Sequence, residues 1–270
     1  MRVGGVQARY WAEGSQGSPV ILIHGIGEYV EIWWPNIVTL AQQHRVFAVD
    51  LPGFGRSDKP VDAPYGYPYF ARFIHDFMSG LGLERASLVG HSLGGAVALQ
   101  AALAFPQKVD RLVLVGSAGL GREVNLILRL ATLPLLGEIL TRPSLQGSRS
   151  FIKAIVYDPA LVKDEDVQVH YEISIQPGAQ QAFLKVLRAI GNVFGQNHNS
   201  TGPILEHLPA ITQPTLVLWG REDAIIPVKH ADVTRRMPNM RVRIFERCGH
   251  SPQFEHRENF DQAVQEFLCD

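Results

Sequence analysis

Ser92 stands in the segment Gly90-His91-Ser92-Leu93-Gly94, with a glycine two positions to either side. A serine hydroxyl is a weak nucleophile at neutral pH, so it needs a base that takes its proton and an acid that orients the base. Small neighbours let a nucleophile lie on a sharp turn between a strand and a helix. The spacing therefore predicts that Ser92 is a nucleophile, if a strand precedes it and a helix follows it.

Two later segments supply candidates for the acid and the base. Gly220-Arg221-Glu222-Asp223 follows one apolar run, and Cys248-Gly249-His250 follows another. An acid and a histidine in this order, each in a loop behind a strand, are the expected partners of such a serine. We predict that Asp223 orients His250 and that His250 takes the proton from Ser92. Glu222 stays an alternative for the acid.

The elements around these residues alternate between short apolar runs and helical patterns. Runs that are apolar on both faces occur at 20–23, 45–49, 86–89 and 111–115, and patterns with helical spacing occur at 33–44, 69–81 and 93–105. Such runs are typical of the central strands of a parallel sheet. We predict an α/β fold whose mostly parallel central sheet carries helices on both faces. Ser92 then lies between a strand and a helix, as a nucleophile requires.

The alternation stops after Gly119. Residues 120–209 contain amphipathic helical stretches and no central strand, and the polar segment 195–202 is typical of a loop. Strand patterns return at 215–219 and 241–245, and a helix at 259–268 ends the pattern. We predict an α/β core of residues 1–119 and 210–270, with residues 120–209 as a helical cap, or lid, over Ser92. The leucines and isoleucines of the cap suit an apolar pocket lining.

Five ordered motifs resemble those of the α/β-hydrolase superfamily, and the resemblance covers nearly the whole chain. They are an oxyanion loop, a glycine-rich turn, a nucleophile elbow, an acid loop and a histidine loop, at His24–Gly27, Asp50–Ser57, Gly90–Gly95, Trp219–Asp223 and Gly249–Pro252. The resemblance implies an acyl-serine intermediate and an oxyanion hole formed by the backbone N–H groups of Ile26 and Leu93. Some members carry the acid after the preceding core strand, but the loop 116–119 has no carboxylate here, which favours Asp223.

The resemblance also narrows the reaction. Haloalkane dehalogenases and epoxide hydrolases of this superfamily have Asp where this chain has Ser92, which disfavours both. We expect a carboxylesterase-like serine hydrolase (EC 3.1.1 type) that cleaves esters of small to medium, mainly apolar acyl groups. The alternative is a carbon–carbon bond hydrolase of the meta-cleavage type, which the segment 248–256 resembles. That group carries Trp directly after the catalytic histidine, whereas this chain has Ser251. A cofactor-free perhydrolase and a non-catalytic ligand receptor are further alternatives.

Other residues near the motifs have weaker signals. Four aromatic residues could line the acyl site or simply pack the core: Trp33, Trp34, Phe54 and Phe254. We expect His24 to brace the oxyanion loop and His91 to pack beside the elbow. The chain has 10 histidines, but no pair of them has metal-ligand spacing with a supporting carboxylate. We therefore expect neither a metal ion nor a cofactor.

Composition disfavours several other classes of protein. The chain has 270 residues and a net charge of -1, without the basic stripe of a nucleic-acid-binding protein. Its two cysteines, Cys248 and Cys269, make no disulfide framework, and no apolar leader follows Met1, so we expect a cytoplasmic protein. Charged residues and a proline interrupt the most apolar stretch, 124–140, which is shorter than the about 20 residues that span a bilayer. We expect a monomer or weak homo-oligomer, without integral membrane association, that acts on a small-molecule ester.

Overall fold

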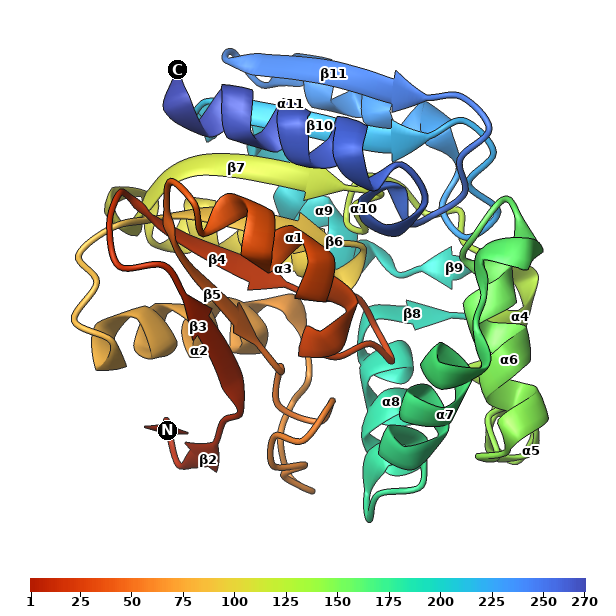
Figure 1. Ribbon diagram of the computed structural model, residues 1–270. Coiled ribbons are helices and arrows are strands. Elements are labelled where there is room, and N and C mark those ends of the chain that lie inside the picture. Colours follow the sequence, from red (N-terminus) through yellow and green to blue (C-terminus); the bar gives the residue numbers. More distant parts are fainter.

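A seven-stranded sheet forms the centre of the molecule in a computed structural model that describes residues 1–270 (Figure 1). The strand order is β11-β10-β7-β6-β4-β5-β3. The bounds are β3 Tyr10–Glu13, β4 Pro19–Ile23, β5 Arg45–Val49, β6 Ala86–His91, β7 Val109–Val115, β10 Thr215–Gly220 and β11 Met240–Phe245. Only β3 runs antiparallel to its neighbour, and the other pairs are parallel. The predicted mostly parallel sheet is confirmed.

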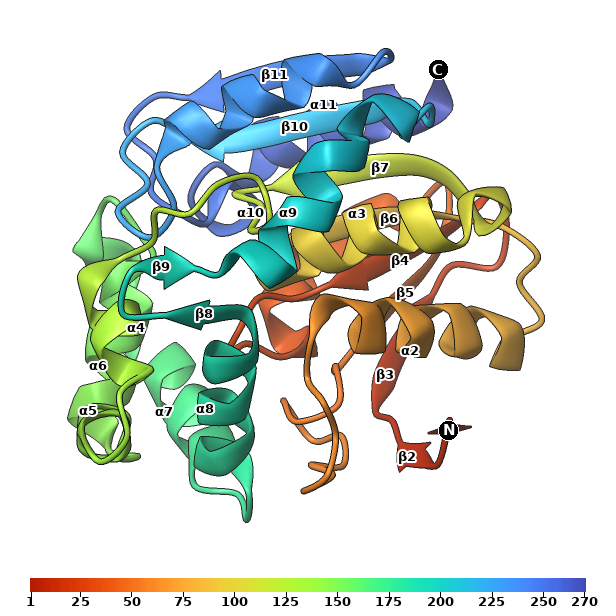
Figure 2. The ribbon, with the colours of Figure 1, turned by 180° about the vertical axis from the view of Figure 1, so that it is seen from behind.

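Successive residues of the central strands point to opposite faces, so each strand supplies two cores. Ile21 of β4 packs in the core beneath α2 (Tyr67–Gly80) and α3 (Leu93–Ala104). Leu22 packs in the other core, beneath α1 (Trp34–Leu40) and α11 (Arg257–Cys269). Figure 1 shows α1 and α11 in front of the sheet, and Figure 2 shows α2 and α3 on the opposite face. Because both faces are covered, these strands are apolar throughout rather than alternating.

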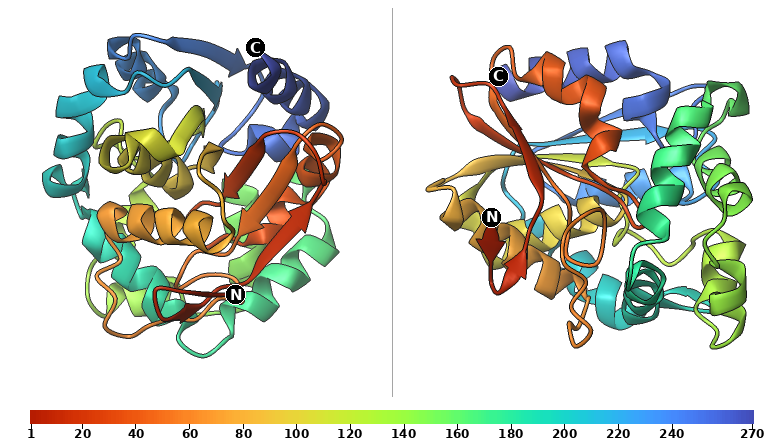
Figure 3. Two further views of the ribbon diagram at one scale, coloured as in Figure 1. Left: turned by 90° about the vertical axis from the view of Figure 1, so that its left-hand side faces the viewer. Right: turned by 60° about the horizontal axis from the view of Figure 1, so that its bottom comes forward.

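The segment between β7 and β10 adds no strand to this sheet. It contains α4 Leu126–Ala131, α5 Leu136–Leu140, α6 Leu145–Ala154, α7 Asp164–Ser174, α8 Ala179–Ile190, α9 His198–His207 and a hairpin of β8 Gly191–Asn192 and β9 Gly195–Gln196. Helices α4 to α8 lie beyond the carboxyl ends of the strands, as the views of Figure 3 also show, whereas α9 lies beside α3. We propose that α4 to α8 form the cap of the site below.

The remaining elements are short. They are β1 Arg2–Val3, β2 Val6–Gln7, α10 Pro252–Glu255 and the 3-10 helices η1 Val30–Trp33, η2 Pro106–Lys108, η3 Pro159–Leu161, η4 Leu208–Ala210 and η5 Val228–Arg236. None of the helices is both long enough and apolar enough to cross a membrane.

The prediction of a loop at residues 195–202 is wrong. The segment contains β9 and the first turn of α9, which begins at His198. The side chain of Asn197 accepts a hydrogen bond from the N–H of Ser200 and so caps this helix at 2.9 Å. Residues such as Asn and Ser favour loops and helix starts alike, because their side chains bond nearby backbone groups. The polar run marked a helix start.

Truncation of a buried residue in the central sheet tests how much the core contributes to stability. Leu112 of β7 is fully buried, so Leu112→Ala should lower the free energy of unfolding by about 2–5 kcal/mol, through lost burial and a cavity. Ile139→Ala is the control, because Ile139 is 71% exposed on α5 and its truncation should change the value by less than about 0.5 kcal/mol. Urea denaturation measures both. Equal losses in the two variants would contradict this account of the core.

Candidate active site

Ser92 occupies a strained turn between β6 and α3. Its φ of 52° and ψ of -112° lie in a region that residues with a side chain rarely adopt. The turn is held by hydrogen bonds from Ser92 N–H to the Val115 carbonyl, 2.8 Å, and from Ala118 N–H to the Ser92 carbonyl, 2.9 Å. A Cβ at Gly90 would lie 2.2 Å from the Gly94 carbonyl oxygen, so backbone crowding requires glycine there. The side chain of Ser92 is thereby presented at the carboxyl edge of the sheet.

Asp223 and His250 come together from the loops that follow β10 and β11. His250 Nδ1 lies 2.7 Å from Asp223 Oδ2, and both side chains are buried. The other oxygen, Asp223 Oδ1, accepts the N–H groups of Ile225 and Ile226 at 2.8 and 2.9 Å. An ionised carboxylate only accepts hydrogen bonds, so His250 carries a proton on Nδ1 and Nε2 is left for the nucleophile.

The alternative acid, Glu222, is engaged elsewhere. Its Oε2 accepts the backbone N–H of Cys248 at 2.9 Å. This bond joins the loops after β10 and β11 but does not reach the imidazole of His250. The geometry therefore favours Asp223 as the acid, and Glu222 as a support for the loop that carries His250.

The oxyanion loop approaches Ser92 closely. His24 Nδ1 lies 2.7 Å from the Gly25 carbonyl, and its Nε2 lies 3.0 Å from Leu51 N–H. This pattern requires a neutral ring protonated on Nδ1, and burial lowers the pKa of His24 accordingly. A Cβ at Gly25 would lie 3.0 Å from Ser92 Cβ. The N–H groups of Ile26 and Leu93, predicted to bind an oxyanion, donate to no group of the protein.

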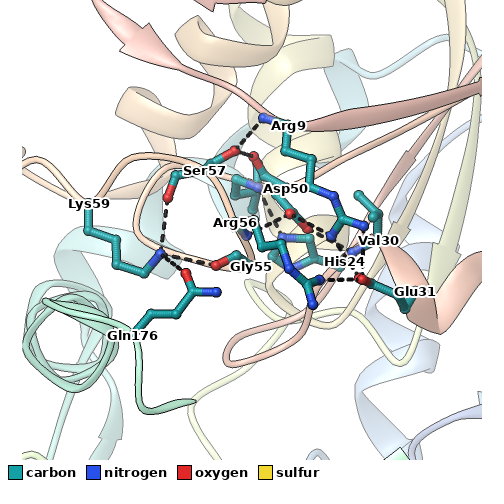
Figure 4. A network of polar contacts seen from close by, with 11 residues as sticks. Arg9, His24, Val30, Glu31, Asp50, Gly55, Arg56, Ser57, Lys59 and Gln176 are labelled. Atoms are coloured by element: carbon teal, nitrogen blue, oxygen red, sulfur yellow. Dashed lines mark hydrogen bonds and ion pairs between the residues drawn. The ribbon is translucent and has the colours of Figure 1, made fainter. Parts of the chain in front are cut away.

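A buried carboxylate joins the loops on the other side of His24 (Figure 4). Asp50 Oδ1 accepts the N–H of Val30 at 2.7 Å, and Oδ2 accepts the N–H of Arg56 at 2.8 Å. Arg9 lies 3.4 Å from the same carboxylate and pairs with Glu31 at 2.8 Å. Burial raises the pKa of Asp50, although the surrounding donors act against this effect. The network ties the segment after β4 to the glycine-rich turn after β5.

Ser92 borders two cavities. The larger, of about 470 Å³, is lined by the core loops and by α4, α6, α7 and α8, and it contains both Ser92 and His250. The smaller, of about 50 Å³, is mostly apolar and includes Leu93, Val124 and Leu187. Both cavities include Ile26 and Ser92. A substrate bond placed at Ser92 could therefore extend into either cavity.

Of the four aromatic candidates, the structure brings only Phe54 into the site. Phe54 lines the larger cavity. Trp33 is fully buried in the core against Phe260, because it belongs to the apolar face that packs on the sheet. Trp34 packs edge-on against Trp11 at the surface. Phe254 is 38% exposed and lines neither cavity.

Two polar residues of the larger cavity, one in the cap and one in the core, were not predicted from the sequence. His170 of α7 lines the larger cavity, with its Nδ1 2.9 Å from Ser148 Oγ and its ring 4.8 Å from that of Phe151. Burial lowers the pKa of His170 to about 4. Lys59 lines the same cavity and reaches Gln176 of the cap at 3.3 Å (Figure 4). No motif marks His170, whereas Lys59 lies two residues after the predicted glycine-rich turn.

Comparison with known proteins agrees with this geometry. Residues 18–137 match the family model described as alpha/beta hydrolase fold. The 2-hydroxy-6-oxo-2,4-heptadienoate hydrolase of Pseudomonas putida is 32% identical over 98% of this chain and 94% of its own length. The chain belongs to the α/β-hydrolase fold family. The expected superfamily and fold are thus confirmed.

Two further comparisons extend over helices α4 to α8 as well as the sheet. The structure of a meta-cleavage product hydrolase from Pseudomonas fluorescens has a TM-score of 0.85 and 32% identity, covering 98% of this chain and 95% of that one. An uncharacterised protein of Mycobacterium tuberculosis is 35% identical over 98% of this chain and 79% of its own length. The likeness to the two named hydrolases therefore covers nearly the entire length of this α/β-hydrolase.

The contacts of the two neighbouring carboxylates predict opposite outcomes of substitution. Asp223→Asn should lower kcat by about 10⁴-fold, because an amide in place of the carboxylate stabilises the wrong tautomer of His250. Glu222→Gln should leave kcat close to the wild-type value, because its amide oxygen still accepts the Cys248 N–H. Steady-state kinetics on a p-nitrophenyl ester measure both variants. The assignment of the acid fails if Glu222→Gln is the more damaging change.

Proposed function

We propose that this protein is a serine-dependent carbon–carbon bond hydrolase of the meta-cleavage type. The observation that carries the proposal is the likeness, at 32% identity and over 98% of this chain, to the heptadienoate hydrolase and to the meta-cleavage product hydrolase. Substrate choice depends on the cap, and this likeness includes the cap. We therefore prefer the carbon–carbon reaction to the ester hydrolysis expected first.

In the proposed reaction, Ser92 Oγ attacks a ketone carbonyl while His250 takes the hydroxyl proton. Asp223 stabilises the imidazolium that forms, and the N–H groups of Ile26 and Leu93 stabilise the oxyanion. Collapse of this intermediate breaks the carbon–carbon bond. The electron pair leaves on a carbon conjugated with a second carbonyl, which then receives a proton. Water hydrolyses the acyl-serine and releases a carboxylic acid.

The cavities support a substrate with two unlike ends. The smaller cavity suits a short apolar acyl group, because its lining is mostly apolar. The larger cavity includes two basic side chains, Lys59 and Arg142, together with the imidazole of His170. We assign the conjugated, oxygen-rich part of the substrate to the larger cavity, where these groups can bind a carboxylate or enol oxygen.

Ester hydrolysis is the second candidate. It needs the same nucleophile, base and oxyanion donors, and an ester oxygen is a better leaving group than carbon. The residue that favours it is Ser251, which stands where the carbon–carbon hydrolases were expected to carry Trp. Ser251 is buried directly beside His250.

We propose that the enzyme is cytoplasmic. We propose further that it acts on a small molecule as a monomer or weak homo-oligomer. Both thiols are unpaired: Cys248 is buried and Cys269 is exposed. Free thiols are ordinary in a reducing compartment.

One substrate panel separates the candidates. A 2-hydroxy-6-oxo-dienoate and a chain-length series of p-nitrophenyl esters are given to the wild type and to Ser92→Ala. We expect the highest kcat/KM for the dienoate, and a loss of about 10⁴-fold or more in Ser92→Ala. Absorbance of the dienoate and of p-nitrophenolate measures both reactions.

Three other results would each contradict a specific part of the proposal. Rapid ester turnover with an inert dienoate would favour the esterase. Tight binding without turnover would favour a receptor. Full hydrolysis by Ser92→Ala would remove Ser92 as the nucleophile.

A further inference from the structure

A second carboxylate–histidine pair lies directly behind the proposed catalytic residues. Glu28 follows the oxyanion loop, and His91 is the last residue of β6, immediately before Ser92. Glu28 Oε2 lies 2.8 Å from His91 Nδ1, with both side chains buried. The ring of His91 lies 4.7 Å from the ring of His250, centroid to centroid. Neither Glu28 nor His91 has a part in the reaction described above.

The partners of His91 define its protonation. Nδ1 faces the Glu28 carboxylate, and Nε2 lies 2.9 Å from the backbone carbonyl of His250. Both partners can only accept hydrogen bonds, so both ring nitrogens must donate and the ring is a cation. Burial disfavours that charge, but the attraction and hydrogen bond of Glu28 outweigh it and raise the pKa of His91. The pKa of Glu28 is correspondingly lowered, against the effect of its burial.

The outward contacts of this pair end on two segments of the proposed site. Glu28 Oε2 also accepts the N–H of Gly25 at 2.6 Å, which fixes the peptide between His24 and Gly25, one peptide before the N–H of Ile26. His91 Nε2 fixes the backbone of His250 through its carbonyl. A Cβ at Gly25 would lie 2.7 Å from Glu28 Oε2, so the carboxylate and the loop are in close contact. One ion pair therefore connects the oxyanion loop, the nucleophile turn and the histidine loop.

We propose that Glu28 and His91 are positioning residues that hold the oxyanion donors and His250 in register with Ser92. His91 lines neither cavity, and Glu28 borders the larger one with its Oε2 engaged by Gly25 and His91. They act through Gly25 and His250, so their contribution is made in the transition state, when charge develops on the oxyanion and on His250. The inference rests on the serine mechanism of the proposed function. It holds for ester and carbon–carbon cleavage alike.

The charged groups that face this pair distinguish it from an ordinary core ion pair. His24 lies on the Glu28 side and is neutral, whereas Asp223 and His250 lie on the His91 side.

Removal of one partner leaves the other charge buried and unpaired, which destabilises the fold strongly. The test therefore uses a variant that removes the charge but keeps hydrogen-bonding groups at the same places. Glu28→Gln keeps an amide oxygen that accepts from both Gly25 N–H and His91 Nδ1, but it removes the negative charge that holds His91 as a cation.

The experiment compares Glu28→Gln and His91→Gln with the control Glu123→Gln. Glu123 also pairs with a buried histidine, His230, at 2.8 Å, but lines neither cavity. For Glu28→Gln and His91→Gln we expect kcat to fall by about 100-fold, as on loss of one oxyanion donor, with KM nearly unchanged. The Ki of a phenylboronic acid, whose serine adduct places an oxygen in the oxyanion hole, should rise in parallel. Glu123→Gln should change neither kcat nor Ki.

Several results would overturn the proposal. One is a lowered Tm with kcat and boronate Ki unchanged in Glu28→Gln, because a purely structural pair gives that pattern. Another is a rise of KM at constant kcat, which would indicate substrate contact.

Histidine ¹⁵N NMR of the wild-type protein at neutral pH provides a direct check of the charge on His91 and needs no destabilised variant. We expect both ring nitrogens of His91 to be protonated, with the ring assigned by through-bond correlation to its own backbone, and a singly protonated His91 would contradict the ion pair. Loss of all activity in Ser92→Ala tests the serine mechanism separately, so failure of the two ideas can be told apart.

Discussion

The conformation of Ser92 is the constraint on which the rest of the site depends. Holding a residue with a side chain at this φ and ψ costs about 1–3 kcal/mol, so the conformation persists only where the surrounding structure enforces it. Here β6 on one side and α3 on the other are buried almost throughout, and the turn is bonded to β7 and to the loop that follows it. The strain directs the hydroxyl away from the sheet, towards two cavities. Gly90 and Gly94 are needed because backbone occupies the space of a side chain, that of Gly94 itself at Gly90 and that of Ile23 at Gly94.

The parallel sheet gathers the other groups at the same edge. Strands β4, β5, β6, β10 and β11 all end there, so the oxyanion loop, the Asp50 turn, the nucleophile, the acid and the histidine are neighbours although the sequence separates them widely. Buried polar contacts then fix these loops to one another. Asp50 connects the segment after β4 with the turn after β5, and Asp223 connects the loops after β10 and β11. The pair of Glu28 and His91 connects the oxyanion loop with the histidine loop. Each connection is made by a charged group that accepts or donates several hydrogen bonds, which is the arrangement that burial of charge requires.

The sequence predicted those parts of the molecule that follow a local rule. The strand at 45–49 has the predicted bounds, because a strand covered on both faces is an uninterrupted apolar run. Strand β3 was missed, since it is a partly exposed edge strand of four residues without such a pattern. The contact between Asp223 and His250 could be anticipated from motif order. The positions of Trp33 and His170 could not, because they depend on which face of a helix packs against the sheet and on how α6 and α7 meet.

The segment between β7 and β10 contributes no strand to the sheet, and this has a consequence for how the molecule can vary. Strands β7 and β10 are hydrogen-bonded neighbours, so the chain from 116 to 214 is in effect one closed loop. The entropy lost on closing a flexible loop grows only with the logarithm of its length, and doubling the length costs about 0.6 kcal/mol. Residues can therefore be inserted or deleted among α4 to α8 with little effect on the pairing that closes the sheet. Natural variation can remodel the walls of the larger cavity while the geometry around Ser92 is inherited unchanged.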